Sequence, residues 1–596
     1  MFIQNQLLMP GEKRAEIARA YYPAGETVDA ATPLRVAAGR EVSGIDVRLS
    51  PPWPSMDASA PPPPARPDAT GTARIEGRIT DAVSGKPIRG ARLLLVGIDG
   101  MSLTNWKRTD AQGRFEYTQL VARRYRLTVS ADRFVPVDFG QRRPGETGVA
   151  IELADGATFK ADVALSRAGA IEGVLYDEYS DPAPGLFVQA ARKQFVAGRS
   201  RLMPIERRAS TAITDDRGHY RLPGLDPGDY YVAALSGAYA DQSETGGFAP
   251  TYYPGTPDSG AATAVTLPFG TDATATFALT PARTVAVSGT MIDANGQPVG
   301  RGTIWLMTPD RLQRADFNLA RGGTAPDGRF VLRNVPQGQY TLQGFGGPPP
   351  GGRGPLNLGA MPFGWTSLSV GDSDLEDVVL KVTSGTVLRG RIVLEDPSVA
   401  PPKAEQVRIN AIPVEFDSAP VGGGPSPSTT NADLTFEVTN MSGLRRVFVT
   451  TGSPAWMLKK ITRNGQEVTD TPLDFRTENV DDVEILLTPK VTAVTGTVPD
   501  EKGRPVTDCA VVIFSSDPSK WIDRSRFVAM VRPNQQGTFA ARGLPPDQYL
   551  AIALPSVVLT EWTDPAFLQQ LRPGATGFAL SEGETRTLTL PLKKRP

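Results

Sequence analysis

The stretch TDDRGHYRLPGLDPGDYYVAA, residues 214–234, decides the fold, because its plan returns along the chain. Asp215 and Gly218 stand at the first and fourth positions of a four-residue turn, where the aspartate side chain caps the local backbone. The next residues alternate between polar and apolar, so we expect Tyr220 to point into a core. A second turn, rich in proline and glycine, leads to a return strand that carries Tyr230. The stretch therefore predicts a β-hairpin.

The same plan occurs five times at a spacing of about one hundred residues, and such internal repetition governs the choice of fold. Each copy opens on an apolar-x-glycine strand: IEGRITD at 75–81, IEGVLYD at 171–177, VSGTMID at 287–293, LRGRIVL at 388–394 and VTGTVPD at 494–500. The hairpin aromatics align as Phe115, Tyr220, Phe330, Phe436 and Phe539. Ten residues later the column reads Tyr125, Tyr230, Tyr340, Arg446 and Tyr549. Copy 4 therefore lacks the tyrosine, and it also lacks the turn glycine.

Seven or so short strands in each hundred residues, with turns every 8 to 12 residues, are typical of a two-layer β-sandwich. The chain is too long for one core at 596 residues. We therefore predict an all-β tandem array of five sandwiches preceded by a partial one. The predicted sandwiches cover residues 71–167, 168–281, 282–383, 384–489 and 490–596.

The motifs G.P..GA.V and T(D/N)..G.F...L.PG.Y.L resemble the carboxypeptidase regulatory-like domain, a transthyretin-like (prealbumin-like) β-sandwich. The resemblance covers residues 71–596 and is weaker in copy 4, whose stretch WMLKKITRNGQEVTD suggests an elaborated loop or an extra hairpin. It implies a place among large bacterial multi-copy proteins of the cell envelope or the secreted fraction. The same fold superfamily includes carbohydrate-binding modules, so the resemblance alone does not assign a function.

The first seventy residues predict an incomplete repeat and a linker. Residues 21–50 echo residues 252–280, so we expect residues 1–50 to be the C-terminal remnant of a truncated repeat. Met1 would then be an internal start, and an export signal would lie upstream of it. Residues 51–70 are a proline-rich linker in extended polyproline form. Two segments rich in glycine and proline, 346–355 and 420–429, are predicted to be flexible loops at sandwich ends.

Composition excludes several classes of function. The net charge of −1 gives no electrostatic footprint for nucleic acid or anionic lipid. No run of 18 or more apolar residues occurs, so we predict no membrane-spanning segment. A single cysteine excludes an intramolecular disulfide framework. The first residues do not resemble a signal peptide, so the predicted extracytoplasmic location follows from the family resemblance.

The only histidine, His219, invites a catalytic interpretation that the repeat does not favour. Its equivalents in the other copies are Arg114, Arg329, Thr435 and Thr538, all polar, so we expect an exposed strand position. A zinc carboxypeptidase site needs two histidines and a carboxylate, which one histidine cannot supply. Cys509 aligns with small residues, which predicts a buried and unreactive thiol. No segment has the spacing of a calcium loop. We predict no enzyme activity, no metal and no cofactor.

Four residues remain as candidates for ligand binding, all in segments where copy 5 departs from the repeat: Trp521, Arg524, Arg526 and Trp562. Exposed tryptophans stack on sugars, and loops at a sandwich end are a common place for binding residues. The alternative is that the tryptophans fill a local satellite core under a short helix, and this interpretation is favoured. The leading hypothesis is thus a non-catalytic structural or interaction protein whose partner is a polysaccharide or an envelope protein. Carbohydrate binding through loop aromatics is the alternative function.

Overall fold

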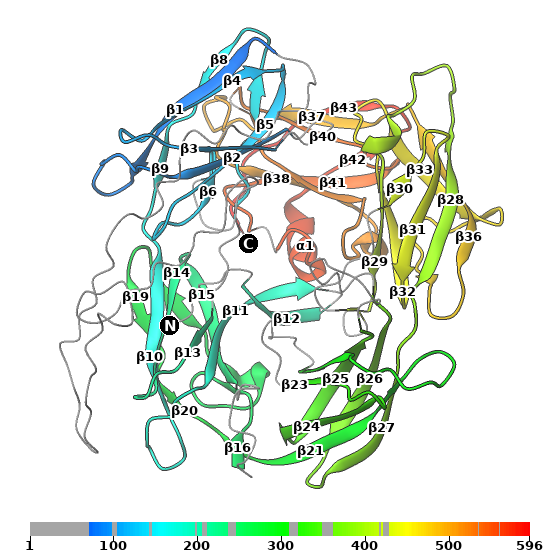
Figure 1. Cartoon of the computed structure of the whole chain (residues 1–596). Coiled ribbons are helices and arrows are strands. Elements are labelled where there is room, and N and C mark those ends of the chain that lie inside the picture. Colours follow the sequence, from blue (N-terminus) through cyan, green and yellow to red (C-terminus); the bar gives the residue numbers. More distant parts are fainter. Residues whose placement is uncertain are drawn as a thin grey trace, which may run out of the picture. The chain divides into compact units, whose positions relative to one another are not determined.

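The first pair of sheets along the chain is built from the strands between β1 (Ala73–Asp81) and β9 (Val163–Leu165) (Figure 1). We propose the five predicted ranges as domains and call them sandwiches 1 to 5. The computed structural model describes residues 71–97, 104–141, 146–196, 199–205, 211–235, 246–308, 320–347, 361–415, 419–420, 428–534, 536–558 and 561–595. The predicted repeat remnant 1–50, the linker 51–70 and most of the two predicted flexible loops lie outside these residues.

Sandwich 1 packs two sheets around one hydrophobic cluster that includes Ile75, Leu93, Tyr117 and Leu127. One sheet has the order β4-β1-β8, with β9 also paired to β1; the other has the order β3-β2-β5-β6, with β7 paired to β5. The strands are β1 (Ala73–Asp81), β2 (Arg92–Gly97), β3 (Thr104–Arg108), β4 (Arg114–Leu120), β5 (Arg123–Ser130), β6 (Val137–Asp138), β7 (Ile151–Leu153), β8 (Thr158–Lys160) and β9 (Val163–Leu165).

Sandwich 2 repeats this plan with the orders β14-β10-β19 and β12-β11-β15-β17. In addition β20 pairs with β10, β13 with β11 and β18 with β15. The strands are β10 (Gly169–Tyr176), β11 (Phe187–Val196), β12 (Arg199–Pro204), β13 (Thr211–Ile213), β14 (His219–Leu225), β15 (Gly228–Leu235), β16 (Gly246–Phe248), β17 (Thr251–Tyr252), β18 (Val265–Leu267), β19 (Asp272–Thr274) and β20 (Phe277–Ala278).

Sandwich 3 has the orders β16-β21-β24, with β27 also on β21, and β23-β22-β25-β26. Strand β16 lies within the range predicted for sandwich 2 yet joins a sheet of sandwich 3, so a strand crosses the predicted boundary. The remaining strands are β21 (Pro281–Ile292), β22 (Thr303–Met307), β23 (Ala320–Gly323), β24 (Arg329–Pro336), β25 (Gly338–Phe345), β26 (Phe363–Val370) and β27 (Leu375–Lys381).

In sandwich 4 the sheet that contains the opening strand has six strands, β30-β31-β28-β36-β33-β34, and the opposite sheet has the order β29-β32-β35. The strands are β28 (Thr386–Leu394), β29 (Arg408–Pro413), β30 (Thr429–Thr430), β31 (Thr435–Met441), β32 (Leu444–Thr450), β33 (Met457–Arg463), β34 (Gln466–Glu467), β35 (Leu473–Asp474) and β36 (Val480–Thr488). Strands β33 and β34 form a hairpin, as the stretch WMLKKITRNGQEVTD suggested.

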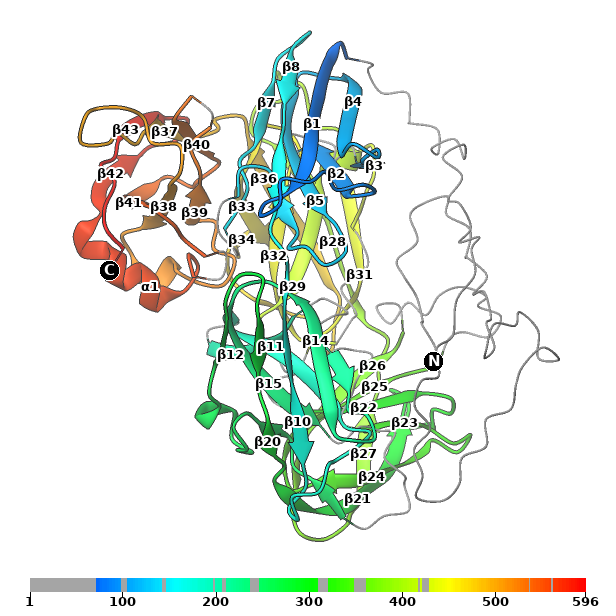
Figure 2. The same ribbon diagram turned by 90° about the vertical axis from the view of Figure 1, so that its left-hand side faces the viewer.

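Sandwich 5 has the orders β40-β37-β43 and β39-β38-β41-β42, and its two layers are separated clearly in Figure 2. The strands are β37 (Ala493–Thr497), β38 (Ala510–Ser515), β39 (Val528–Val531), β40 (Thr538–Arg542), β41 (Asp547–Leu554), β42 (Thr576–Leu580) and β43 (Thr585–Thr589). One helix, α1 (Pro565–Leu571), lies against the outer side of the second sheet. The predicted all-β fold of tandem sandwiches is confirmed.

The turn in the opening stretch forms as predicted. Asp215 Oδ1 accepts hydrogen bonds from the backbone N–H groups of Arg217 (3.0 Å) and His219 (2.8 Å), and Gly218 closes the turn at φ 71°. The bond from the His219 N–H is the main cause that holds the pKa of Asp215 below its ordinary value. His219 is exposed at the start of β14, while Tyr220 is buried. The position predicted for the histidine is therefore confirmed.

Copy 4 requires a correction to the aromatic column. The residue that points into the core of sandwich 4 is Arg445, not Arg446, because the inward position comes nine residues after Phe436 in copy 4 and ten residues after Phe539 in copy 5. The buried Arg445 guanidinium donates to the carbonyl oxygens of Ser442 (2.8 Å) and Ala411 (3.0 Å). Its burial lowers its pKa to about 10. Leu434 occupies the position of the missing turn glycine, in the left-handed region at φ 64°.

In sandwiches 1, 2, 3 and 5 the hydroxyl of the aligned tyrosine bonds to the turn that precedes its own strand. Tyr549 donates its hydroxyl to the Pro545 carbonyl at 2.7 Å, and Tyr340 makes the equivalent bond to Pro336 at 2.9 Å. In both cases the acceptor lies four residues earlier in the chain and the bond is buried. The aromatic ring fills the core while its hydroxyl fixes the turn.

We expect Tyr549→Phe to lower the free energy of unfolding of sandwich 5 by about 1 kcal/mol, because the buried Pro545 carbonyl loses its donor. Chemical denaturation followed by hydrogen exchange of residues 490–596 measures this loss. Tyr179→Phe is the control, since that side chain is 78% exposed and should tolerate the change. Equal effects of the two substitutions would contradict the assigned role.

Candidate functional site

The two predicted tryptophans lie in a satellite core on the outer side of the β38–β41 sheet. Trp521 is 5% exposed, its Nε1 donates to the Ser515 carbonyl at 2.8 Å, and its ring meets Phe514 edge to face. Trp562 is half-buried and packs against the same cluster. Trp521 also lines the cavity between β29, β32 and α1, and a binding role for the two tryptophans stays a prediction.

Helix α1 closes this satellite core. Asp564 caps its first turn by accepting the Ala566 N–H at 2.8 Å, and Pro565 occupies the first helical position, which proline favours. Phe567 and Leu568 turn inward onto the sheet. The segments in which copy 5 differs from the repeat therefore form a second hydrophobic core in this sandwich.

The two predicted arginines have different environments. Arg524 is exposed, with φ 54°, in the loop that follows Trp521. Arg526 is half-buried, and its Nε donates to a carboxylate oxygen of Asp470 at 2.9 Å. Asp470 follows the extra hairpin of sandwich 4. Arg526 therefore joins sandwich 5 to sandwich 4, a role that the sequence did not reveal.

A second arginine, which belongs to sandwich 4, contacts the main chain of sandwich 5. Arg446, on β32 of sandwich 4, donates through Nε to the Asp470 carbonyl at 2.9 Å and through Nη1 to the Asp523 carbonyl of sandwich 5 at 3.4 Å. Partial burial lowers the pKa of Arg446, and the carboxylates of Asp470 and Asp523 oppose this shift. The insertions of copies 4 and 5 thus contact each other, so the two departures from the repeat form one structural feature.

A cluster of four charges adds to this junction beside the link between the two sandwiches. Lys459, on β33, pairs with Glu395 of sandwich 4 and with Glu582 of sandwich 5, the latter at 2.6 Å. Lys490, in the link itself, lies 3.5 Å from Glu582. The hydrogen bonds from Lys459 lower the pKa of both glutamates, and Glu395 raises the pKa of Lys459. The cluster therefore stabilises the charged forms.

The lowered pKa values make the junction sensitive to acid. A carboxyl group whose pKa is lower in the folded state contributes stability above its ordinary value of 4.5, and that contribution is lost as pH falls through the lowered value. We expect the melting temperature of sandwich 5 to be constant near neutral pH and to fall below about pH 4.5. Glu582→Gln should flatten this dependence; an unchanged pH profile would contradict the assignment.

Sandwich 5 also contacts sandwich 1 through a buried arginine. The side chains of Arg532 and Glu146 are each 6% exposed and pair at 3.4 Å. Arg532 also donates to the Thr147 carbonyl at 2.8 Å and pairs with Asp508 at 2.9 Å. Asn534 Nδ2 donates to a Glu152 carboxylate oxygen at 3.1 Å. Arg532 and Glu146 lie 386 positions apart and Asn534 and Glu152 lie 382 apart, and no periodic signal in the sequence marks these pairs.

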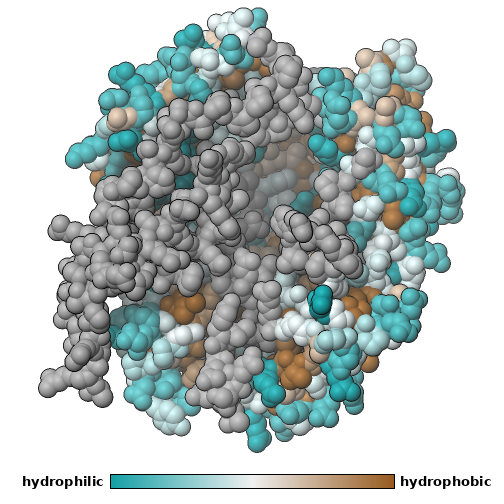
Figure 3. Space-filling model, viewed as in Figure 1, coloured by the Kyte–Doolittle hydropathy of each residue, from teal (hydrophilic) through white to brown (hydrophobic). Residues whose placement is uncertain are grey.

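Cys509 is buried, and the surface in view is mostly hydrophilic. Cys509 is 1% exposed in the core of sandwich 5, where burial raises the pKa of its thiol to about 11, as expected of an unreactive cysteine. Figure 3 shows mostly hydrophilic side chains on the coloured part of the face in view, with smaller hydrophobic patches. No helix in the described ranges has the length and apolar character needed to cross a membrane.

One segment of the chain matches a known protein family. Residues 74–166, which build sandwich 1, match the carboxypeptidase regulatory-like domain family. No curated protein matches the chain.

Solved structures with similar folds include three pilins from bacteria. The minor pilin GBS52 of Streptococcus agalactiae is 15% identical, with a TM-score of 0.23, over 35% of this chain and 96% of the pilin. The shaft pilin SpaA of Lactobacillus rhamnosus GG is 13% identical, with a TM-score of 0.19, over 35% and 98%. The major pilin BcpA of Bacillus cereus is 11% identical, with a TM-score of 0.13, over 52% and 99%. Because these TM-scores are low, the fold assignment rests on the sheets and on the family match.

Proposed function

We propose, from the match of residues 74–166 to the carboxypeptidase regulatory-like domain family, that the chain is a non-catalytic, extracytoplasmic structural and interaction protein. Its sandwiches form a stiff array. The observation that supports this proposal is the junction of sandwiches 4 and 5, where Arg526 binds Asp470 and Arg446 binds the carbonyl groups of both insertions. Segments that depart from the repeat are used there to join domains. The extracytoplasmic location is supported by the resemblance of the repeat to bacterial envelope proteins.

The stiffness of the junction is tested by unfolding the full chain. We expect sandwiches 4 and 5 to unfold in one transition, measured by hydrogen exchange of peptides from both. Asp470→Ala removes the carboxylate that holds Arg526, so sandwich 5 should then open at a lower temperature. Asp474→Ala is the matched control, because Asp474 pairs with the neighbouring Arg476 on the exposed surface of sandwich 4. Independent unfolding of the two sandwiches in the parent chain would contradict the proposal.

Carbohydrate binding is the second candidate function. Of the two predicted tryptophans, the half-buried Trp562 has the larger exposed fraction and is the candidate for stacking on a sugar. Retention on a panel of polysaccharides tests it. A sugar platform predicts retention that Trp562→Ala abolishes at an unchanged melting temperature. A sharply lowered melting temperature would favour the satellite-core role, and no retention on any polysaccharide would exclude this candidate.

A further inference from the structure

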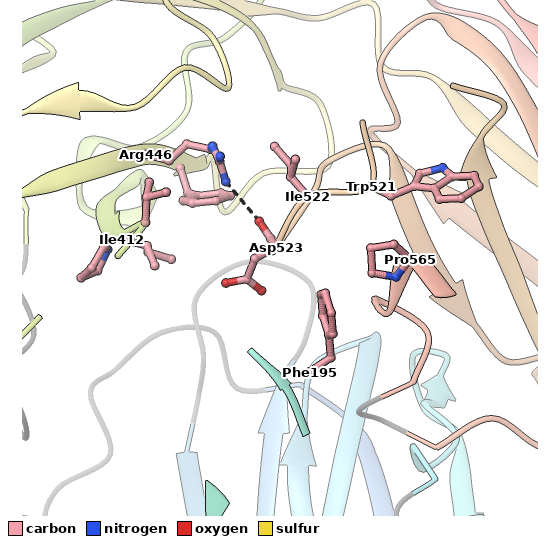
Figure 4. A pocket seen from close by; sticks show the side chains of 10 residues that line it. Phe195, Ile412, Arg446, Trp521, Ile522, Asp523 and Pro565 are labelled. Atoms are coloured by element: carbon pink, nitrogen blue, oxygen red, sulfur yellow. Dashed lines mark hydrogen bonds between the residues drawn. The ribbon is translucent and has the colours of Figure 1, made fainter. Parts of the chain in front are cut away.

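A cavity of about 320 Å³ lies where segments of sandwiches 2, 4 and 5 meet (Figure 4). Its walls are mostly apolar and include Phe195 from the end of β11, Ile412 from β29, Phe448 from β32 and Pro565 from α1. Two charged side chains line the same space, Arg446 and Asp523. The volume lies at the lower end of the range for small-molecule sites, which combine apolar walls with a few polar groups.

Arg446 carries a positive charge that no carboxylate neutralises directly. Its guanidinium donates to two main-chain carbonyl groups, those of Asp470 and Asp523. The carboxylate of Asp470 is bound by Arg526 instead, at 2.9 Å. The guanidinium is therefore partly desolvated yet forms no ion pair within 4.0 Å among the described residues. An anionic group in the cavity would complete its charge pairing.

Asp523 presents the opposite charge to the same cavity. Figure 4 shows its carboxylate directed away from the Arg446 guanidinium, on the side of Phe195 and Ile412. The hydrogen bond from Arg446 goes to the main-chain carbonyl of Asp523, so the Asp523 carboxylate acts on the Arg446 charge only through space. In the described part of the chain this half-buried carboxylate has no hydrogen-bond or ion-pair partner. A half-buried charge is costly unless a ligand or water pairs with it.

We propose that the cavity binds a free α-amino acid with an apolar side chain. The ligand's carboxylate would pair with Arg446, its ammonium group with Asp523, and its side chain would occupy the apolar walls. A ligand that carried one charge alone would leave the other cavity charge unpaired, so a zwitterion is selected. The space is sufficient: a protein cavity of about 150 Å³ accommodates benzene, and this cavity is about twice as large.

Calorimetric titration of the full chain with L-phenylalanine tests the proposal, with three analogues that each lack one feature. Phenylacetate lacks the ammonium group, phenethylamine lacks the carboxylate, and glycine lacks the apolar side chain. We expect each analogue to bind about tenfold more weakly than phenylalanine, or weaker still. Absence of saturable binding of phenylalanine up to about 10 mM would overturn the proposal. Equal affinity for phenylalanine and any one analogue would do the same.

Asp523→Asn is the decisive variant, because it keeps the main-chain carbonyl that Arg446 contacts and removes the negative charge. We expect it to weaken phenylalanine binding about tenfold and to strengthen phenylacetate binding, because the negative charge that phenylacetate leaves unpaired is removed. Arg524→Gln is the matched control, since its exposed side chain does not line the cavity. An Asp523→Asn chain with parental melting temperature and parental affinity for phenylalanine would overturn the assignment.

Discussion

Gly496→Ala should strongly destabilise sandwich 5. A Cβ atom at Gly496 would stand 2.0 Å from the main-chain oxygen of Leu588 and 2.8 Å from the ring of Phe539. Leu588 lies on β43, which pairs in parallel with β37 at this residue, so the methyl group could fit only if the two strands separated. We expect a loss of about 3 kcal/mol in the free energy of unfolding, the upper range for overpacking. Hydrogen exchange of residues 490–596 measures it.

Gly577→Ala is the matched control for this prediction. It lies on β42 of the same sandwich, and the atom nearest to an added Cβ is 3.9 Å away. Alanine there should be neutral or stabilise by up to about 1 kcal/mol, because it restricts the unfolded chain. Similar exchange rates in the two variants would show that the close contact at Gly496 has no role in the fold.

Arg532→Met should release sandwich 1 from sandwich 5. The substitution removes two ion pairs and a main-chain hydrogen bond, and it leaves the buried Glu146 carboxylate without Arg532. Loss of one partner of a buried ion pair costs about 3 to 5 kcal/mol. We therefore expect the segments 146–150 and 532–534 to exchange hydrogen much faster, while the strands of both sandwiches keep their protection.

An exposed ion pair in the same sandwich supplies the control. Arg504 pairs with Asp500 at 2.8 Å, but its side chain is 72% exposed. Arg504→Met should change stability by less than about 1 kcal/mol, as is usual for surface pairs. If Arg532→Met were equally mild, the contact between sandwiches 1 and 5 would not be a stabilising interface.

Local chemistry made the repeat unit predictable. Asp215, Gly218 and Tyr220 act over a few residues, so their spacing alone predicted the turn, the exposed histidine and the buried ring. The sequence motif identified the glycine of each opening strand, but it did not show why a larger side chain cannot replace it. In every copy an added Cβ would stand about 2 Å from a carbonyl oxygen of the closing segment, at Gly77, Gly173, Gly289, Gly390 and Gly496.

The junctions between sandwiches could not be predicted, because they join residues that are far apart in sequence and belong to non-repeated segments. Arg526 was selected as a ligand-binding residue, and nothing in its neighbourhood pointed to Asp470 of the previous copy. The shift from Arg446 to Arg445 in the core of sandwich 4 had a similar cause. The spacing between the two inward-facing side chains is one residue shorter there, and alignment by fixed spacing cannot detect such a change.

We propose that contacts between their insertions hold sandwiches 4 and 5 in a fixed relation. Spin labels at Glu478→Cys in sandwich 4 and Lys502→Cys in sandwich 5 would measure it in the full chain, since both positions are exposed. Cys509 should stay unlabelled because its thiol is buried and its pKa is raised to about 11. We expect one narrow distribution of the distance between the two labels, and we expect Asp470→Ala to broaden it. A broad distribution in the parent chain would contradict this proposal.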